Sequence, residues 1–191
     1  MKKKKMFTGN MRELAMLVAL VVIIIFFYFC TQGKILKPMN ISNLINQNAY
    51  VVILAIGMLL CILTGGNIDL SVGSNCVLCT CTIGVLVQNF GITNPVILIL
   101  IGLLVSTCAG IVNGLLLTRL DLPHPFVSTM GMKNVLWGLA LIVTNSQMVN
   151  NFPTSVQWLG NTTIGGFPVS FVVVIVLYVI MHVFLSRTAL G

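Results

Sequence analysis

Long apolar stretches separated by short polar connections dominate this sequence. They cover residues 14–30, 49–64, 75–90, 95–117, 126–145 and 168–185. A transmembrane helix needs about 17–25 residues to cross roughly 30 Å of hydrocarbon, and several of these stretches reach that length. We therefore predict an all-α fold, a polytopic transmembrane bundle of about six helices that forms a single domain over the whole chain.

Composition supports the same class. Hydrophobic residues make up 58% of the chain, charged residues 7%, and the mean hydropathy is +1.07, whereas a soluble domain has about 25% charged residues. The net charge of +7 would indicate nucleic acid in a soluble protein, but no basic face with interleaved aromatic residues is present. Membrane lipid is the expected partner, and nucleic acid is excluded.

The basic residues also predict how the bundle is oriented. Cytoplasmic flanks of membrane helices collect Lys and Arg. With the N-terminus in the cytoplasm, the lysines at residues 2–5 lie inside together with Arg12, Arg119 and Arg187, against Lys34 and Lys37 outside. We therefore predict a cytoplasmic N-terminus, with residues 64–74 near the cytoplasmic side and residues 146–167 facing outward.

Residues 64–74 break the apolar pattern with the sequence Thr-Gly-Gly-Asn-Ile-Asp-Leu-Ser-Val-Gly-Ser. Glycines permit backbone shapes that other residues avoid, and non-helical backbone at membrane depth requires cover from protein or a water-filled cavity. We predict a functional break here, and its residues are candidates for a translocation path. Its candidate residues are Gly65, Gly66, Asp69, Ser71, Gly73 and Ser74.

Asp69 is one of three acidic residues in the chain and has two interpretations. It caps the third helix, accepting amide hydrogen bonds at an end where negative charge is favoured. Alternatively, the break is a hinge or part of the translocation path, by analogy with the discontinuous helices of other transporters.

The stretch 95–117 carries Ser106, Gly110 and Gly114 at every fourth residue. One side of this helix therefore lacks bulk, which predicts a seam where another helix backbone approaches closely. Asn113 beside it is an intramembrane amide that we expect either to hydrogen-bond across helices or to face a cavity.

The six cysteines predict no metal site. Cys76, Cys79 and Cys81 share one apolar stretch without a nearby His or carboxylate, so we interpret them as small packing residues.

The run Gly-Gly-Asn-Ile-Asp-Leu-Ser-Val-Gly-Ser at residues 65–74 closely resembles the Gly-Ile-Asp-Leu-Ser-Val-Gly-Ser signature of bacterial ABC sugar permeases. These permeases are of the ribose, xylose and arabinose type. Supporting motifs follow in the same order at residues 109–116, Ala-Gly-Ile-Val-Asn-Gly-Leu-Leu, and at residues 122–132, Leu-Pro-His-Pro-Phe-Val-Ser-Thr-Met-Gly-Met. The chain is most similar to permeases of multiple-monosaccharide transporters, over essentially its whole length.

The resemblance implies a pore subunit that moves monosaccharides across the bacterial inner membrane by alternating access. It would pair with an identical or different second permease subunit and with two cytoplasmic ATPase subunits. Sugar would arrive from a periplasmic or lipid-anchored binding protein. The sequence has no Gly-x-x-x-x-Gly-Lys-Ser/Thr phosphate loop, so the chain is expected to be a transport subunit rather than an enzyme, with no cofactor of its own and ATP used by a partner.

The alternative is a stand-alone secondary transporter or channel for small polar solutes. A coupled carrier usually needs intramembrane carboxylates for its ion, and Asp69 is the single candidate near the membrane.

The sequence departs from the family pattern in two ways. Family members are usually longer, and the ending that contains Arg187, Thr188 and Gly191 resembles the entrance to the cytoplasmic loop that engages the ATPase. We therefore expect a C-terminally truncated chain. The second departure is Trp137, where relatives often have arginine. Lys133, one helical turn earlier, either snorkels toward the cytoplasmic interface or replaces that arginine and faces the bundle interior.

Overall fold

The computed structural model describes residues 3–63, 68–119, 125–150 and 152–188. Within these ranges the elements are α1 (Lys3–Cys30), the 3-10 turn η1 (Lys34–Leu36), α2 (Pro38–Leu63), α3 (Val72–Phe90), α4 (Pro95–Arg119), α5 (Pro125–Val143), α6 (Thr154–Asn161), β1 (Thr163–Ile164), β2 (Phe167–Pro168) and α7 (Val169–Arg187). Six helices of the described chain are long and apolar enough to cross a membrane. The predicted polytopic helical bundle is therefore confirmed.

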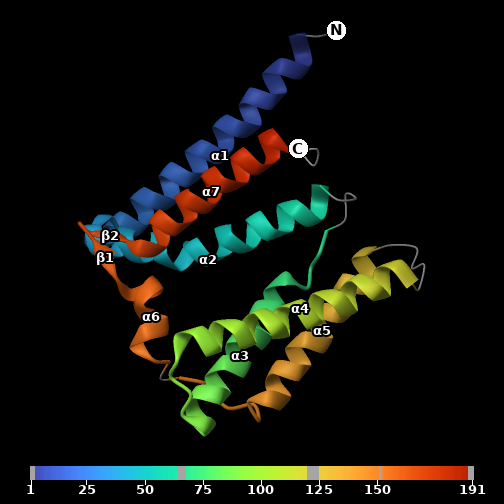
Figure 1. Cartoon of the computed structure of the whole chain (residues 1–191). Helices are drawn as coiled ribbons and strands as arrows, with labels where there is room; N and C mark the ends of the chain where they lie inside the picture. Colours follow the sequence, from blue (N-terminus) through green and yellow to red (C-terminus); the bar gives the residue numbers. More distant parts are fainter. Residues whose placement is uncertain (1–2, 64–67, 120–124, 151, 189–191) are drawn as a thin grey trace.

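The long helices form two groups. Helix α3 packs against both α4 and α5, while α2 packs against α7, and Figure 1 shows these groups side by side. A core of five buried residues lies in the α3–α4–α5 group: Leu78, Ala109, Met132, Leu136 and Ala140. The membrane-spanning part of α1 has no buried residue, so its apolar surface is available to lipid or to another subunit.

Helix α4 follows α3 after a sharp reversal of the chain. Gly91 ends α3 in the left-handed conformation, with φ 65°. Its amide bonds the Val87 carbonyl over 3.2 Å, and the Ile92 amide bonds the Leu86 carbonyl over 3.4 Å. Glycine carries no Cβ and is therefore favoured at this cap. Pro95 then opens α4, a position that suits proline because its missing N–H needs no partner there.

The second helix begins at Pro38 and not at residue 49, so the predicted polar connection over residues 31–48 is partly wrong. Polar residues in the first half of α2 find partners elsewhere in the chain. Asn46 donates from Nδ2 to the Gly160 carbonyl, and Ser170 Oγ donates to Asn46 Oδ1 over 2.6 Å. These contacts with α6 and α7 satisfy the hydrogen-bonding groups of the Asn46 side chain. A search for apolar runs leaves such a polar residue out of the helix. The first helix likewise begins well before residue 14, at Lys3.

Residues 146–167 hold more structure than the predicted outward connection. They contain α6, and β1 pairs antiparallel with β2 through Thr163↔Pro168 and Ile164↔Phe167. The turn between these strands is Gly165 and Gly166, both with positive φ, 59° and 88°. A two-residue hairpin turn favours such glycines. The all-α class predicted from the sequence is therefore confirmed, and the fold adds one very short hairpin between α6 and α7.

Candidate functional site

The described part of the break between α2 and α3 is a tight turn closed by Asp69. Asp69 Oδ1 accepts hydrogen bonds from the Ser71 amide over 2.8 Å and from Ser71 Oγ over 2.6 Å. A carboxylate that bonds its own backbone two residues on is an Asx turn. Ser71 is only 4% exposed, so this carboxylate is the acceptor for two buried donors. We call Ile68 to Ser71 the signature turn.

Helix α3 begins at Val72, directly after this turn, and not at residue 75 as predicted. Gly73 and Ser74 therefore lie in the first helical turn, which corrects their placement in the break. Asp69 precedes the helix by three residues, and Ser71 at the N-cap makes no side-chain cap bond. Gly65 and Gly66 lie outside the described residues.

Helices α4 and α5 both hold the signature turn. Asn113 of α4 donates from Nδ2 to Ser71 Oγ over 3.3 Å. Thr129 Oγ1 of α5 lies 3.3 Å from the Ile68 carbonyl oxygen and 3.2 Å from the Phe126 carbonyl oxygen of its own helix, so its proton is shared between the two. Asn113 is 5% exposed and Thr129 is 2% exposed. Because both side chains are nearly buried, these polar contacts hold the turn between the two helices.

A cavity of about 270 Å³ lies beside the signature turn. It is lined by Cys61, Ile68, Asp69, Gly110, Asn113, Gly114, Leu117 and Thr129, and we call it the signature cavity. Asn113 Oδ1 is buried and has no hydrogen-bond partner among the described residues. An unpaired buried acceptor costs about 1–3 kcal/mol, so this amide is suited to accept a hydrogen bond from a ligand hydroxyl. Asn113 thus both bonds across helices and lines a cavity.

The small-residue seam of α4 is closely packed at one end only. Asn75 Nδ2 of α3 lies 3.0 Å from Ser106 Oγ, and a Cβ at Gly102 would lie 3.1 Å from Ile83 Cδ1. A Cβ at Gly110 or Gly114 would meet nothing within 4 Å. The predicted close approach is therefore absent at these two glycines within the described chain, and their missing side chains widen the signature cavity instead.

The other predicted site residues lie elsewhere. Lys133 is exposed on α5 and does not line the signature cavity, so it does not face the interior of this chain's own α3–α4–α5 group. Arg187 ends α7, and Thr188 caps it by donating from Oγ1 to the Phe184 carbonyl over 2.7 Å. Gly191 lies outside the described residues.

Thr129 did not emerge from the sequence as a site residue, although it belongs to the motif at residues 122–132. Replacing Thr129 by valine keeps the shape but removes the hydroxyl contact with Ile68. We expect a loss of about 1 kcal/mol in unfolding free energy, measured by thermal unfolding in detergent. Thr107→Val is the control, because Thr107 Oγ1 bonds only the Leu103 carbonyl of its own helix, over 2.6 Å. Equal losses in both variants would contradict the assigned contact.

Comparison with known proteins now places this architecture. Residues 40–191 match the family described as the permease component of the branched-chain amino acid transport system. The chain belongs to this family. No solved structure matches the permease significantly.

Relatives of the permease carry names that refer to import. Ribose import permease protein RbsC of Bacillus subtilis is 32% identical over 192 residues, which covers 99% of this chain and 58% of that protein. Fructose import permease protein FruG of Bifidobacterium longum is 31% identical over 94% of this chain and 56% of its own length. Galactofuranose transporter permease protein YtfT of Escherichia coli is 32% identical over 78% of this chain and 42% of its own length. The chain thus spans about half the length of these relatives, and the resemblance to sugar permeases is confirmed.

Proposed function

We propose that this chain is the membrane-spanning permease part of an ATP-driven importer of monosaccharides in the bacterial inner membrane. The observation that carries the proposal is the signature turn, held by Asn113 and Thr129 beside a polar cavity within a bundle of membrane-spanning helices. The names of the relatives, for ribose, fructose and galactofuranose, support a sugar as the solute.

The signature cavity offers what a neutral polyol needs. Asn113 Oδ1 is an open acceptor, and Asp69 contributes a carboxylate that can accept further hydroxyl donors. Because the same turn is tied to α4 and α5, a displacement of these helices would move the cavity wall and the ligand contacts together. In alternating access, such a movement would open the path to one side of the membrane while closing it to the other.

The proposed assembly follows the orientation that the basic residues predict. With a cytoplasmic N-terminus, the signature cavity lies toward the cytoplasm, and the end of α7 with Arg187 and Thr188 lies on the ATPase side. A second permease subunit, identical or different, two ATPase subunits and a periplasmic or lipid-anchored sugar-binding protein complete the importer. ATP is bound and hydrolysed by the ATPase partners.

One observation favours the second candidate, a secondary transporter or channel. Asp69 lines the signature cavity, and a cavity carboxylate is the group that an ion-coupled carrier requires. The Asp69 carboxylate nevertheless accepts two hydrogen bonds within its own turn, which is a structural role that needs no coupling ion.

Uptake of ¹⁴C-labelled ribose, fructose and galactose separates the candidates. Cells would carry the chain together with the proposed ATPase and binding-protein partners, and the matched control would replace the phosphate-loop lysine of the ATPase. We expect uptake that is lost in this control and survives a protonophore while ATP is maintained. Uptake that persists in the control but collapses with the protonophore would establish the secondary transporter instead.

A further inference from the structure

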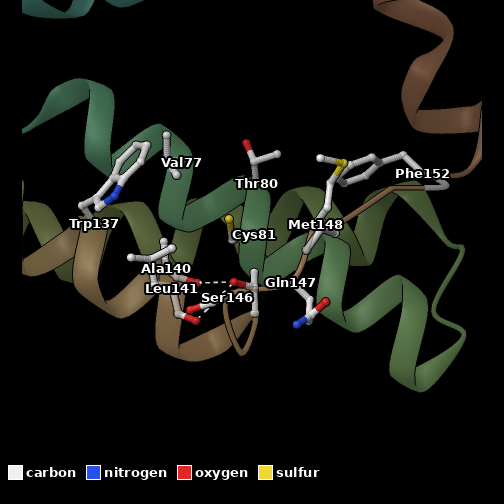
Figure 2. A pocket seen from close by; sticks show the side chains of 12 residues that line it. Val77, Thr80, Cys81, Trp137, Ala140, Leu141, Ser146, Gln147, Met148 and Phe152 are labelled. Atoms are coloured by element: carbon white, nitrogen blue, oxygen red, sulfur yellow. Dashed lines mark hydrogen bonds between the residues drawn. The ribbon is translucent and has the colours of Figure 1, made fainter.

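A second cavity lies toward the opposite end of α5 from the signature cavity. It has a volume of about 560 Å³ and is lined by α3, by the C-terminal half of α5 and by the segment that follows α5. Figure 2 shows Trp137 on one side, Met148 and Phe152 on the other, and Thr80 of α3 between them. We call it the tryptophan cavity. Its volume falls within the roughly 300–1,000 Å³ of small-molecule sites.

The wall formed by residues 144–150 and by Phe152, here called the 144–152 segment, is held in place by the chain around it. Asn145 and Ser146 both adopt positive φ, 50° and 57°, which reverses the chain at the end of α5. The Ser146 amide bonds the Leu141 carbonyl over 2.8 Å, and Gln88 Nε2 of α3 donates to the Asn150 carbonyl over 2.7 Å. The shape of the cavity is therefore set by the fold. Its wall contains two residues other than glycine, Asn145 and Ser146, in a left-handed conformation that is costly unless the surrounding structure supports it.

The lining indicates an uncharged ligand with both an apolar face and hydroxyl groups. None of the described lining residues is charged, and an ionised ligand would lose its hydration there without a compensating partner. Trp137 is 51% exposed and presents an aromatic face, whose negative potential attracts the weakly positive C–H groups of a sugar ring. Thr80 adds an exposed hydroxyl between the aromatic groups, whereas the exposed Gln147 amide is directed away from Trp137 in Figure 2.

A lipid chain would suit a different cavity of the same helices. The groove that Leu104, Val112 and Leu139 help to line is apolar throughout its described residues, whereas the tryptophan cavity contains Thr80, Ser146 and Gln147. Thr80 Oγ1 already donates to the Cys76 carbonyl over 2.9 Å, but an acyl chain would offer no donor to its oxygen and no partner to Ser146 or Gln147. The tryptophan cavity therefore favours a ligand that carries hydroxyl groups.

We propose that the tryptophan cavity binds a neutral monosaccharide, with the sugar ring stacked on Trp137 and its hydroxyls bonded to Thr80, which lies between Trp137 and Met148 in Figure 2. This inference rests on the proposed function and adds a sugar contact distinct from the signature cavity. In the predicted orientation it lies on the outward side, so a sugar released by a binding protein would reach Trp137 before Asn113.

Uptake of the labelled sugars below saturation tests the proposal in cells that carry the whole importer. Loss of an aromatic stacking contact and its buried area corresponds to about a tenfold change, so Trp137→Ala is expected to lower uptake about tenfold. Trp137→Phe keeps an aromatic face and should retain most of it. Trp158→Phe is the control, since Trp158 lies outside the cavity on α6 and is 56% exposed. Immunoblots of membranes correct for abundance.

Fluorescence supplies a second readout that does not require transport. The chain has two tryptophans, so Trp158→Phe leaves Trp137 as the reporter in the detergent-purified protein. A saturable change with ribose, fructose or galactose, absent with the ionised sugar acid gluconate, supports the proposal. Quenching by lipids with brominated acyl chains without any response to sugars would overturn it.

The two proposals fail in different ways. If the wild-type importer takes up none of the three sugars and Trp137 responds to none, both the sugar-import function and the sugar site are rejected. If the wild type imports a sugar and Trp137→Ala imports it equally well at equal abundance, the sugar site alone is rejected.

Discussion

Gly84→Leu is expected to force the 144–152 segment away from α3 and to lower the free energy of unfolding by about 1–3 kcal/mol. A Cβ at Gly84 would lie 2.0 Å from Val149 Cγ1 and 3.1 Å from Phe152 Cζ. The first distance is far below van der Waals contact, and the remaining atoms of leucine add to the overlap. Either the segment that walls the tryptophan cavity or helix α3 must therefore shift to make room for the leucine.

The matched control is Gly57→Leu, because Gly57 also lies within a membrane-spanning helix and a Cβ there would meet nothing within 4 Å. Thermal unfolding in detergent should show a lower melting temperature for Gly84→Leu only. In the Trp158→Phe background, Trp137 emission should also shift to the red as its cavity opens. Equal melting temperatures for the two leucine variants would show that the 144–152 segment does not rest on Gly84.

Gly84 also shows what the sequence could not reveal. It is an isolated glycine in an apolar helix, and its neighbour Val149 lies far along the chain in a segment without a periodic pattern. The sequence instead drew attention to Gly110 and Gly114, whose four-residue spacing is typical of a helix seam. Spacing records which residues share a face of a helix, but only the tertiary fold decides whether that face meets a backbone or a cavity.

The membrane-spanning helices were predictable because bilayer thickness imposes a length on apolar runs. The residues at which these helices begin and end were harder to predict. Polar residues begin α2 because Asn46 finds partners in α6 and α7, contacts that no local pattern contains. The hairpin turn at Gly165 and Gly166 did carry a local signal, since adjacent glycines favour two-residue turns.

The candidate site was predictable in part. Asp69, Ser71 and Asn113 were identified from the sequence, and the structure joins them in one hydrogen-bonded chain. Thr129 was missed because a threonine near a helix start commonly bonds its own helix. Its contact with the Ile68 carbonyl depends on α5 lying against the signature turn, which only the folded chain reveals.

Asp69→Ala is expected to lower the free energy of unfolding by about 1–3 kcal/mol and to reduce sugar uptake at least tenfold. The Ser71 amide and hydroxyl would both lose their acceptor. Because Ser71 is nearly buried, water cannot replace that acceptor, and Asn113 would then face a hydroxyl that is no longer oriented. The signature turn would lose its fixed shape at the point where α4 holds it.

Asp69→Asn separates the shape of the turn from its charge. The amide oxygen of asparagine can accept both Ser71 hydrogen bonds, so the turn keeps its shape although a neutral acceptor bonds roughly half as strongly as a charged one. We therefore expect a melting temperature close to that of the wild type and uptake within about threefold. Glu13→Gln on α1, which removes an exposed carboxylate from outside the bundle core, is the control for lost charge. A stable Asp69→Asn variant that imports as poorly as Asp69→Ala would instead assign the carboxylate charge a direct part in moving the sugar.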